Sequence, residues 1–206
     1  TRKGREKTIN QHTKMKRPFA MVALIAAILT SACKPESKNQ TSNEAEDFYE
    51  IPTAPAVPTE AELIERGKYL VITSACHDCH SPKVMTEHGP EPDPTKLMSG
   101  HPKDEVLPPA EENAGLNGWV LFSPNLTAFI GPWGTTYAAN LTPDDTGIGA
   151  WTFENFKTAI RKGKYKGQEG GRDLLPPMPW QMYRNMNDED LKAIFTYLKS
   201  LPKVDN

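Results

Sequence analysis

Residues 76–80 read Cys-His-Asp-Cys-His, a pair of cysteines three positions apart with a histidine directly after the second. Two thiols at this spacing can each add to one vinyl group of the same porphyrin, which gives two thioether bonds. The histidine then lies beneath the ring, where its imidazole can ligate the iron as the proximal ligand. The motif therefore predicts one covalently attached haem c, with Cys76 and Cys79 as attachment points and His80 as iron ligand.

A cysteine pair of this kind also occurs in zinc sites and in redox dithiols. A structural zinc site needs four ligands, and the only other cysteine of the chain, Cys33, has another use. A thioredoxin-like dithiol belongs in a βαβ pattern, which does not surround this pair. Haem is therefore the preferred interpretation of the motif.

The first 33 residues are not expected in the folded domain. Residues 1–14 precede a convincing start at Met15, and we interpret them as an upstream extension that is absent from the mature protein. Residues 15–33 have a basic start, an apolar run from Phe19 to Leu29 and then small residues, which is the layout of a bacterial export signal. The apolar run is about half of the roughly 20 residues that a membrane-spanning helix needs, although an uncleaved signal anchor is an alternative.

The export signal ends in Leu-Thr-Ser-Ala-Cys at residues 29–33, which resembles the lipobox of bacterial lipoproteins. Lipoproteins prefer leucine three positions before the cysteine, whereas Leu29 lies four before Cys33. The alternative is an ordinary cleavable signal with a chance cysteine. We expect lipidation of Cys33, which would hold an exported protein at a membrane surface of the bacterial cell envelope, facing the periplasm.

After processing, the chain is acidic. Residues 34–206 carry 17 Lys and Arg against 25 Asp and Glu, a net charge of −8. Nucleic acid binding requires a basic face, so a nucleic acid partner is not expected. The sequence likewise contains no Ser-His-Asp order, no phosphate-binding loop and no pair of catalytic carboxylates. We therefore do not expect an enzyme.

The remaining chain divides into a linker and one domain. Residues 34–58 are polar and then rich in proline, which predicts a flexible linker. Residues 59–206 are expected to form the folded domain. Within it, seven prolines fall between Pro82 and Pro109, so residues 81–118 are predicted to be a long loop without regular structure, lying over the haem. Residues 119–150 are interpreted as turn-forming segments.

Three helices are predicted in the domain. The first spans residues 60–74, because Thr59 and Glu62 form a capping box ahead of apolar residues at helical spacing. The second follows Trp151, with Thr152 as its cap, and runs to Lys162. The third begins after Asn187 and stops before Pro202. Gly67 in the first helix is expected to allow close crossing by an aromatic residue of the last one, Phe195 or Tyr197.

The order of parts along the chain resembles that of a monohaem class I cytochrome c. A helix comes first, followed by the haem motif, loops, a methionine among prolines and a C-terminal helix. The chain further resembles the haem c domains of the cytochrome c subunit of bacterial membrane-bound alcohol and gluconate dehydrogenases. The residues that carry this resemblance are Arg66–Leu70, Ser123–Thr127, Asn140–Gly149, Trp151, Phe156, Pro176–Trp180, Met186 and Asp188–Leu191. Those subunits carry three haem motifs and this chain carries one, so docking on the substrate side does not transfer. The resemblance implies a mainly α, cytochrome c-like helical domain around a covalently attached haem, with long loops.

Met178 is the predicted distal ligand, from its position in the chain and from the resemblance. Its thioether would raise the reduction potential relative to a second histidine, and the prolines around it restrict the loop. Met182 and Met186 are fallback candidates, and Met178 filling the core is the alternative. Among the other histidines, His101 is a candidate distal ligand, whereas His77 and His88 are expected at the surface. The four tryptophans are expected to wall the haem, with Arg161 or Arg172 among the candidate propionate ligands.

Together these patterns predict a one-electron carrier with His/Met axial ligation. Redox partners would be a dehydrogenase, a quinol-oxidising complex or a terminal oxidase, and the lipid anchor would keep the haem near them. Two alternatives remain open. One is a haem-based ligand-binding or sensor protein with an open or labile distal site, and the other is an electron-transfer subunit of a dehydrogenase complex.

Overall fold

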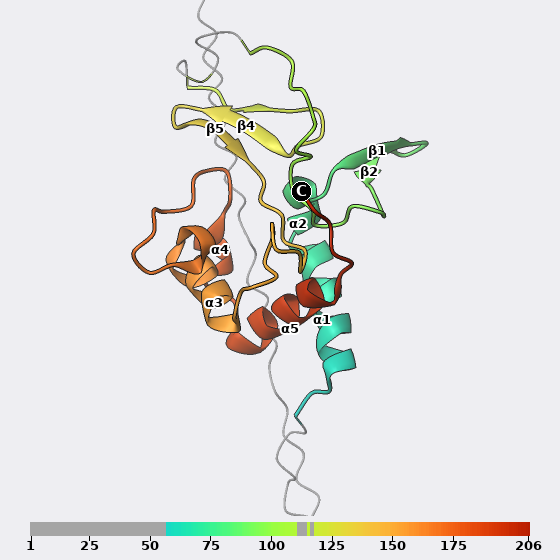
Figure 1. The fold of residues 1–206 in the computed structure, drawn as a ribbon, viewed down its shortest axis with the longest axis vertical. Coiled ribbons are helices and arrows are strands. Elements are labelled where there is room, and N and C mark those ends of the chain that lie inside the picture. The colour runs from blue at the N-terminus through green and yellow to red at the C-terminus, as the bar shows by residue number, and fades with distance from the viewer. Residues whose placement is uncertain (1–56, 111–114, 116–117) are drawn as a thin grey trace, which may run out of the picture. The chain divides into compact units, whose positions relative to one another are not determined.

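The computed structural model describes residues 57–110, 115 and 118–206, which comprise helices and two small antiparallel sheets (Figure 1). The helices are α1 (Glu60–Thr73), α2 (Cys76–His80), α3 (Phe153–Lys162), α4 (Trp180–Tyr183) and α5 (Asp188–Ser200), with a short 3₁₀ turn at Tyr165–Gly167. One sheet pairs β1 (Lys83–Thr86) with β2 (Gly89–Pro92). The other has the order β3 (Leu121–Phe122), β4 (Ala128–Gly131), β5 (Gly134–Tyr137).

The N-terminal and C-terminal helices cross at a glycine. A Cβ atom built on Gly67 would lie 2.7 Å from the Tyr197 Cβ and would overlap the backbone carbonyl of Ala193, so only glycine permits this approach. The predicted crossing is confirmed, and of the two aromatic candidates it is Tyr197 that meets Gly67. Because α1 and α5 pack this closely, Val71, Leu191 and Leu198 are almost completely buried between the elements of the core.

The helix ends lie where the capping residues predict them. Thr59 and Glu62 form the capping box of α1, and Thr152 and Asn155 form that of α3. Asn187 accepts a hydrogen bond from the backbone N–H of Asp190 and so caps α5. Such caps satisfy backbone donors that have no partner within the helix. The three predicted helices are therefore confirmed, whereas the short helices α2 and α4 were not predicted.

The prediction that residues 81–118 lack regular structure was wrong at β1 and β2. These strands pair antiparallel from Lys83↔Pro92 to Thr86↔Gly89. Proline has no N–H to donate, but both strands of a two-stranded ribbon are edges, so Pro90 and Pro92 are tolerated there. Gly89 supplies the positive φ, 105°, that follows the two-residue turn.

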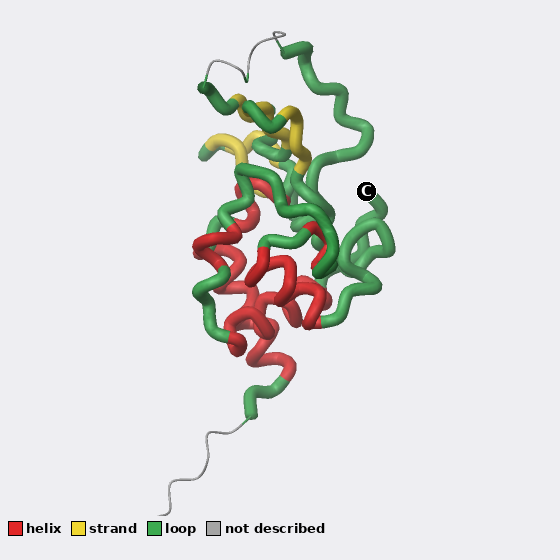
Figure 2. The backbone as a smooth tube through the Cα atoms, turned by 90° about the vertical axis from the view of Figure 1, so that its left-hand side faces the viewer, coloured by secondary structure: helices red, strands yellow, loops and turns green. Residues whose placement is uncertain are grey.

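The interpretation of residues 119–150 as turns alone was also incomplete. Turns are present, but they connect the strands β3, β4 and β5, and Ala128 and Phe129 of β4 are buried. The strands are two to four residues long, and the turns between them contain Pro124 and Pro132. The strands therefore leave no alternating pattern in the sequence. In Figure 2 the helices gather together, and the three-stranded sheet lies at one end of them.

The described residues thus hold five α-helices, long connecting segments and small sheets, which confirms the helical part of the predicted fold and adds strands to it. None of the helices in the described ranges is long and apolar enough to cross a membrane. The predicted signal peptide at 15–33, the extension at 1–14 and nearly all of the linker lie outside the described residues.

Replacement of Gly67 by alanine tests the helix crossing. The new methyl group would collide with the backbone of α5, and overpacking of this kind costs about 1–3 kcal/mol. We expect Gly67→Ala to lower the free energy of unfolding by that amount in urea titrations. Gly170→Ala is the control, because a Cβ there meets nothing within 4 Å, and it should change stability by less than about 0.5 kcal/mol. Equal stabilities for the two variants would contradict the crossing.

Ion pairs fasten the start of α5 to α3. Asp188 lies 2.6 Å from the Arg161 Nη2 and 3.1 Å from the Lys157 Nζ. Hydrogen bonds from Arg161 and then Lys157 lower the pKa of the Asp188 carboxyl group. A lowered pKa in the folded state means that the ionised carboxylate stabilises the fold above its unfolded pKa, and that this contribution disappears as the pH falls through the folded value.

The variant Asp188→Asn tests this linkage. At neutral pH we expect it to unfold at a lower urea concentration than the wild-type protein. The difference should shrink as the pH falls below the usual aspartate pKa, about 3.9, because the wild-type carboxylate then becomes protonated. Glu189→Gln, which changes an adjacent exposed carboxylate, is the matched control and should show no such convergence. A pH-independent difference for Asp188→Asn would contradict the assignment.

Candidate functional site

The helix α2 consists of the motif itself and places both cysteines on one pocket. Cys76 and Cys79 are three residues apart, so their side chains share a face of the helix. Both line an apolar pocket together with His80, and the space free of protein atoms is ≈ 590 Å³, part of it open to solvent. Burial raises the pKa of Cys76 to about 11 and also raises that of Cys79. Both side chains are therefore neutral thiols at physiological pH.

The orientation of His80 is set by one hydrogen bond. Its Nδ1 lies 2.8 Å from the carbonyl oxygen of Ala139. A carbonyl can only accept, so Nδ1 carries the proton and Nε2 keeps its lone pair. Burial lowers the pKa of His80, which favours the neutral ring. A neutral imidazole with a free Nε2 in an apolar pocket is suited to ligate a metal.

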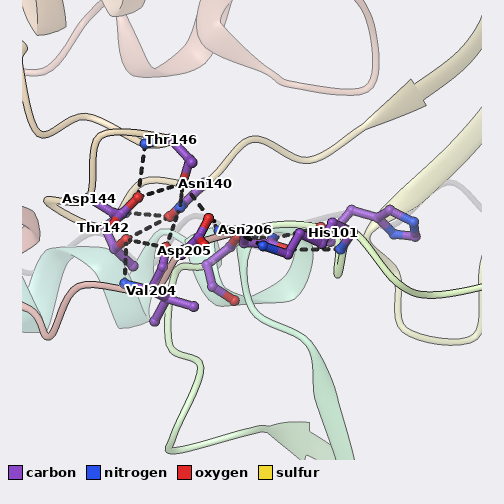
Figure 3. Close-up of polar contacts among 10 residues, drawn as sticks. His101, Asn140, Thr142, Asp144, Thr146, Val204, Asp205 and Asn206 are labelled. Atoms are coloured by element: carbon purple, nitrogen blue, oxygen red, sulfur yellow. Dashed lines mark hydrogen bonds and ion pairs between the residues drawn. The ribbon is translucent and has the colours of Figure 1, made fainter.

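The carbonyl that receives this bond is held by the C-terminal segment. Asn140, the residue after Ala139, donates to the carbonyl oxygen of Val204 at 2.7 Å. The side chain of Asn206 donates to the carbonyl oxygens of Ser99 and His101 at 2.6 and 2.7 Å. Figure 3 shows Val204 beside Asn140, and Asn206 beside His101. The backbone that orients His80 is thus fixed by residues some 60 positions later in the chain.

Met178 lines the same pocket as His80. It is partly buried and packs against the hydrophobic core. Of the fallback candidates, Met186 also lines the pocket, whereas Met182 is 68% exposed and does not contribute to its described wall. The structure therefore brings Cys76, Cys79, His80 and Met178 together around one cavity.

Tyr183 closes the pocket between α4 and the end of α1. Its hydroxyl donates to the carbonyl oxygen of Ser74 at 2.7 Å. Burial raises the pKa of Tyr183 to about 12, so the phenol remains protonated and able to donate. This contact links the segment after Met178 to the segment just before Cys76. Nothing in the sequence pattern singled out Tyr183.

Met98 is a further wall residue that the sequence did not reveal. It is 1% exposed and lines the pocket from the segment predicted to be a loop over the haem. The Ser81 hydroxyl accepts from the Met98 backbone N–H at 2.9 Å, and Met98 has a positive φ of 60°. Because Ser81 follows His80, this contact places Met98 beside the motif. The surrounding prolines and charges gave no periodic signal for a buried residue.

The other histidines lie elsewhere. His101 contacts the Thr127 hydroxyl at 2.9 Å and lines a separate, polar pocket, so it does not join the site of His80. His88 is exposed, as predicted. His77 is not fully at the surface, because its ring is partly buried and lies 2.9 Å from the Ser81 hydroxyl.

The prediction that tryptophans wall the haem finds no support in the pocket. All four tryptophans are described, and none lines it. Trp180 packs on Gly163 and Trp133 on Gly131, while Trp119 is 73% exposed. The candidate propionate ligands have other partners as well: Arg161 pairs with Asp188, and Arg172 stacks on the ring of Tyr165. Cys33, the predicted lipidation site, lies outside the described residues.

The residues present fit a haem c. The pocket wall is apolar, as a porphyrin face requires, and the two thiols open into it beside a histidine of the correct tautomer. The part of the chain that the structure describes holds no group of three or more His, Cys, Asp and Glu side chains that could bind a metal ion. The donors that the pocket wall offers besides the thiols are the His80 imidazole and the thioethers of Met98, Met178 and Met186, and imidazole and thioether are haem iron ligands.

Sequence comparisons agree with this site. The chain is 46% identical over 154 residues to a component of the nicotinate dehydrogenase of Pseudomonas putida, 74% of this chain and 10% of that protein. It is 32% identical over 136 residues to the gluconate 2-dehydrogenase cytochrome c subunit of Pantoea cypripedii, 66% of this chain and 22% of that protein. It is 30% identical over 149 residues to the fructose dehydrogenase cytochrome subunit of Gluconobacter japonicus, 70% of this chain and 23% of that protein.

No family model matches the chain. The chain spans about a tenth to a quarter of the length of these curated relatives. Over most of its own length it resembles cytochrome c subunits of bacterial dehydrogenases, as the sequence motifs predicted.

Replacement of the two cysteines tests covalent attachment. We expect the double variant Cys76→Ala/Cys79→Ala to lose all haem staining on a denaturing gel, because thioether bonds are what survive denaturation. Cys33→Ser is the control and should keep the stain, since its predicted modification is lipid. Haem that stays with the denatured double variant, or that is lost from Cys33→Ser, would contradict the assignment.

Proposed function

We propose that the chain is a one-electron carrier that holds a single haem c in a cytochrome c-like helical domain. Cys76 and Cys79 would form the thioether bonds, His80 would be the proximal ligand and Met178 the distal ligand. The relatives are named as cytochrome subunits of dehydrogenases, which supports electron transfer as the role of the matched segment.

One observation carries this proposal. Residues 80 and 178, almost a hundred positions apart, line the same apolar pocket, with the two cysteines beside them. The hydrogen bond to Ala139 leaves the Nε2 of His80 free for iron. A structural role alone would not explain why two thiols and one imidazole converge with the thioether of Met178 on a cavity whose wall is mostly apolar.

The haem, when bound, would supply an iron that alternates between the ferric and ferrous states. The residues of the chain would hold this group, exclude water from it and fill both axial positions. An iron with two protein ligands has no place for a substrate, so the site is suited to transfer electrons and not to transform a bound molecule. The thioether of Met178 would favour the ferrous state.

A dehydrogenase is the partner that the comparisons favour, because the relatives are subunits of dehydrogenases. A quinol-oxidising complex or terminal oxidase would be the other redox partner. We place the protein in the bacterial cell envelope, exported and lipid-anchored through Cys33. If the chain is a permanent subunit of a complex, a tagged full-length protein will co-purify with a larger subunit, whereas a free carrier will not.

Methionine replacements test the distal ligand. We expect the ferrous Met178→Ala protein to bind carbon monoxide fully, with a shift of the Soret band, because loss of the thioether opens one axial position. Met182→Ala is the matched control, since this neighbouring methionine is 68% exposed and lies outside the pocket wall. Its spectrum should not respond to carbon monoxide.

The variant Met186→Ala distinguishes Met178 from Met186, two of the three methionines that line the pocket. Carbon monoxide binding by Met186→Ala together with an unresponsive Met178→Ala protein would show that Met186 is the distal ligand in place of Met178. An unresponsive spectrum in all three variants would contradict ligation by Met178 and by Met186.

A further inference from the structure

The segment from β5 to Ala139 is hydrogen-bonded both to His80, at the end of α2, and to the loop that carries Met178. Ala139 accepts the hydrogen bond from His80, and three residues earlier the Thr136 hydroxyl donates to the Pro176 carbonyl oxygen at 2.9 Å. We infer that residues 134–139 brace the haem site, and that Thr136 is a positioning residue that holds the Met178 loop against the iron. This inference rests on the proposed His80 and Met178 ligation.

The Met178 loop has few other hydrogen bonds. Leu174 donates from its backbone N–H to the Gly163 carbonyl oxygen at 2.6 Å, and Pro179 accepts from Met182 at 2.9 Å. Between these points, within the described residues, the bond from Thr136 is the only hydrogen bond that reaches residues 175–178. Pro176 and Pro177 have no N–H to donate. The loop is stiff, and the one hydrogen bond to residues 175–178 lies two residues before Met178, whose side chain packs against the core.

Residues 134–139 are themselves held by strand pairing and by backbone hydrogen bonds. Thr136 lies opposite Phe129 of β4, which is buried, so the strand cannot move without disturbing the sheet. Beyond the strand, Ala138 donates to the Thr127 carbonyl oxygen at 2.8 Å and accepts from the His101 N–H at 2.9 Å. The Thr136 hydroxyl therefore connects the three-stranded sheet to the segment that carries Met178 and adds a hydrogen bond to the core packing of that residue.

Removal of the Thr136 hydroxyl should make the Met178 loop more mobile and leave His80 in place. Thr136→Val keeps the shape and the strand preference of the residue but cannot donate. Loss of one net hydrogen bond raises the population of the open loop by about fivefold. The apparent affinity of an added ligand rises with the open population. We therefore expect the ferric Thr136→Val protein to bind imidazole about fivefold more tightly than the wild-type protein in a spectrophotometric titration.

Two further variants make the test specific. Thr136→Ser keeps a hydroxyl and should restore affinity close to the wild-type value. Thr135→Val changes the adjacent residue, which is exposed, and should behave as the wild-type protein. Haem content and far-UV circular dichroism of the full-length, haem-loaded variants serve as checks that the fold is intact.

Met178→Ala measured in parallel separates this inference from the function on which it rests. If Met178→Ala binds imidazole more tightly but Thr136→Val does not, the brace is wrong and the His/Met ligation stands. If Met178→Ala binds imidazole as the wild-type protein does, Met178 is not the ligand and both proposals fall. Equal gains in Thr136→Val and Thr135→Val would show a general loosening of β5 and would overturn the specific role of Thr136.

Discussion

A neutral imidazole offers one nitrogen lone pair to a metal, and the hydrogen bond between His80 and Ala139 decides which nitrogen that is. The bond keeps the proton on Nδ1 and leaves the Nε2 lone pair free. Its geometry depends on the backbone at Ala139, which the C-terminal segment holds through Asn140 and Val204. The motif at residues 76–80 supplies this histidine, but residues far away in the sequence orient it.

The apolar pocket depends in turn on the packing of the helices. Gly67 lets α1 and α5 approach closely, and the pocket wall continues from Val71 on α1 to Leu191 and Leu198 on α5. An apolar wall of this kind favours binding of a flat apolar group and would limit the access of water to it. The contact of Tyr183 with Ser74 then joins the distal segment to the start of the motif. The contacts that hold the helices together therefore also shape the pocket.

The local signals of the sequence predicted the three longer helices, α1, α3 and α5, well. Thr59, Thr152 and Asn187 act through contacts within three residues, and such contacts are readable without a structure. The contributions of Met98 and of the Ala139 carbonyl were not readable, because they depend on chain segments that meet only after folding. The short strands β3, β4 and β5 were missed for a different reason, since they are too short for an alternating pattern to develop.

The visible spectrum of the dithionite-reduced full-length protein, matured in a host that attaches haem c, tests the central claim most directly. It should be recorded before and after the addition of carbon monoxide. A c-type spectrum that carbon monoxide leaves unchanged is the predicted result, because both axial positions are filled by the protein. A c-type spectrum that shifts would contradict a closed electron-transfer site, and the absence of any haem spectrum would contradict the haem assignment itself.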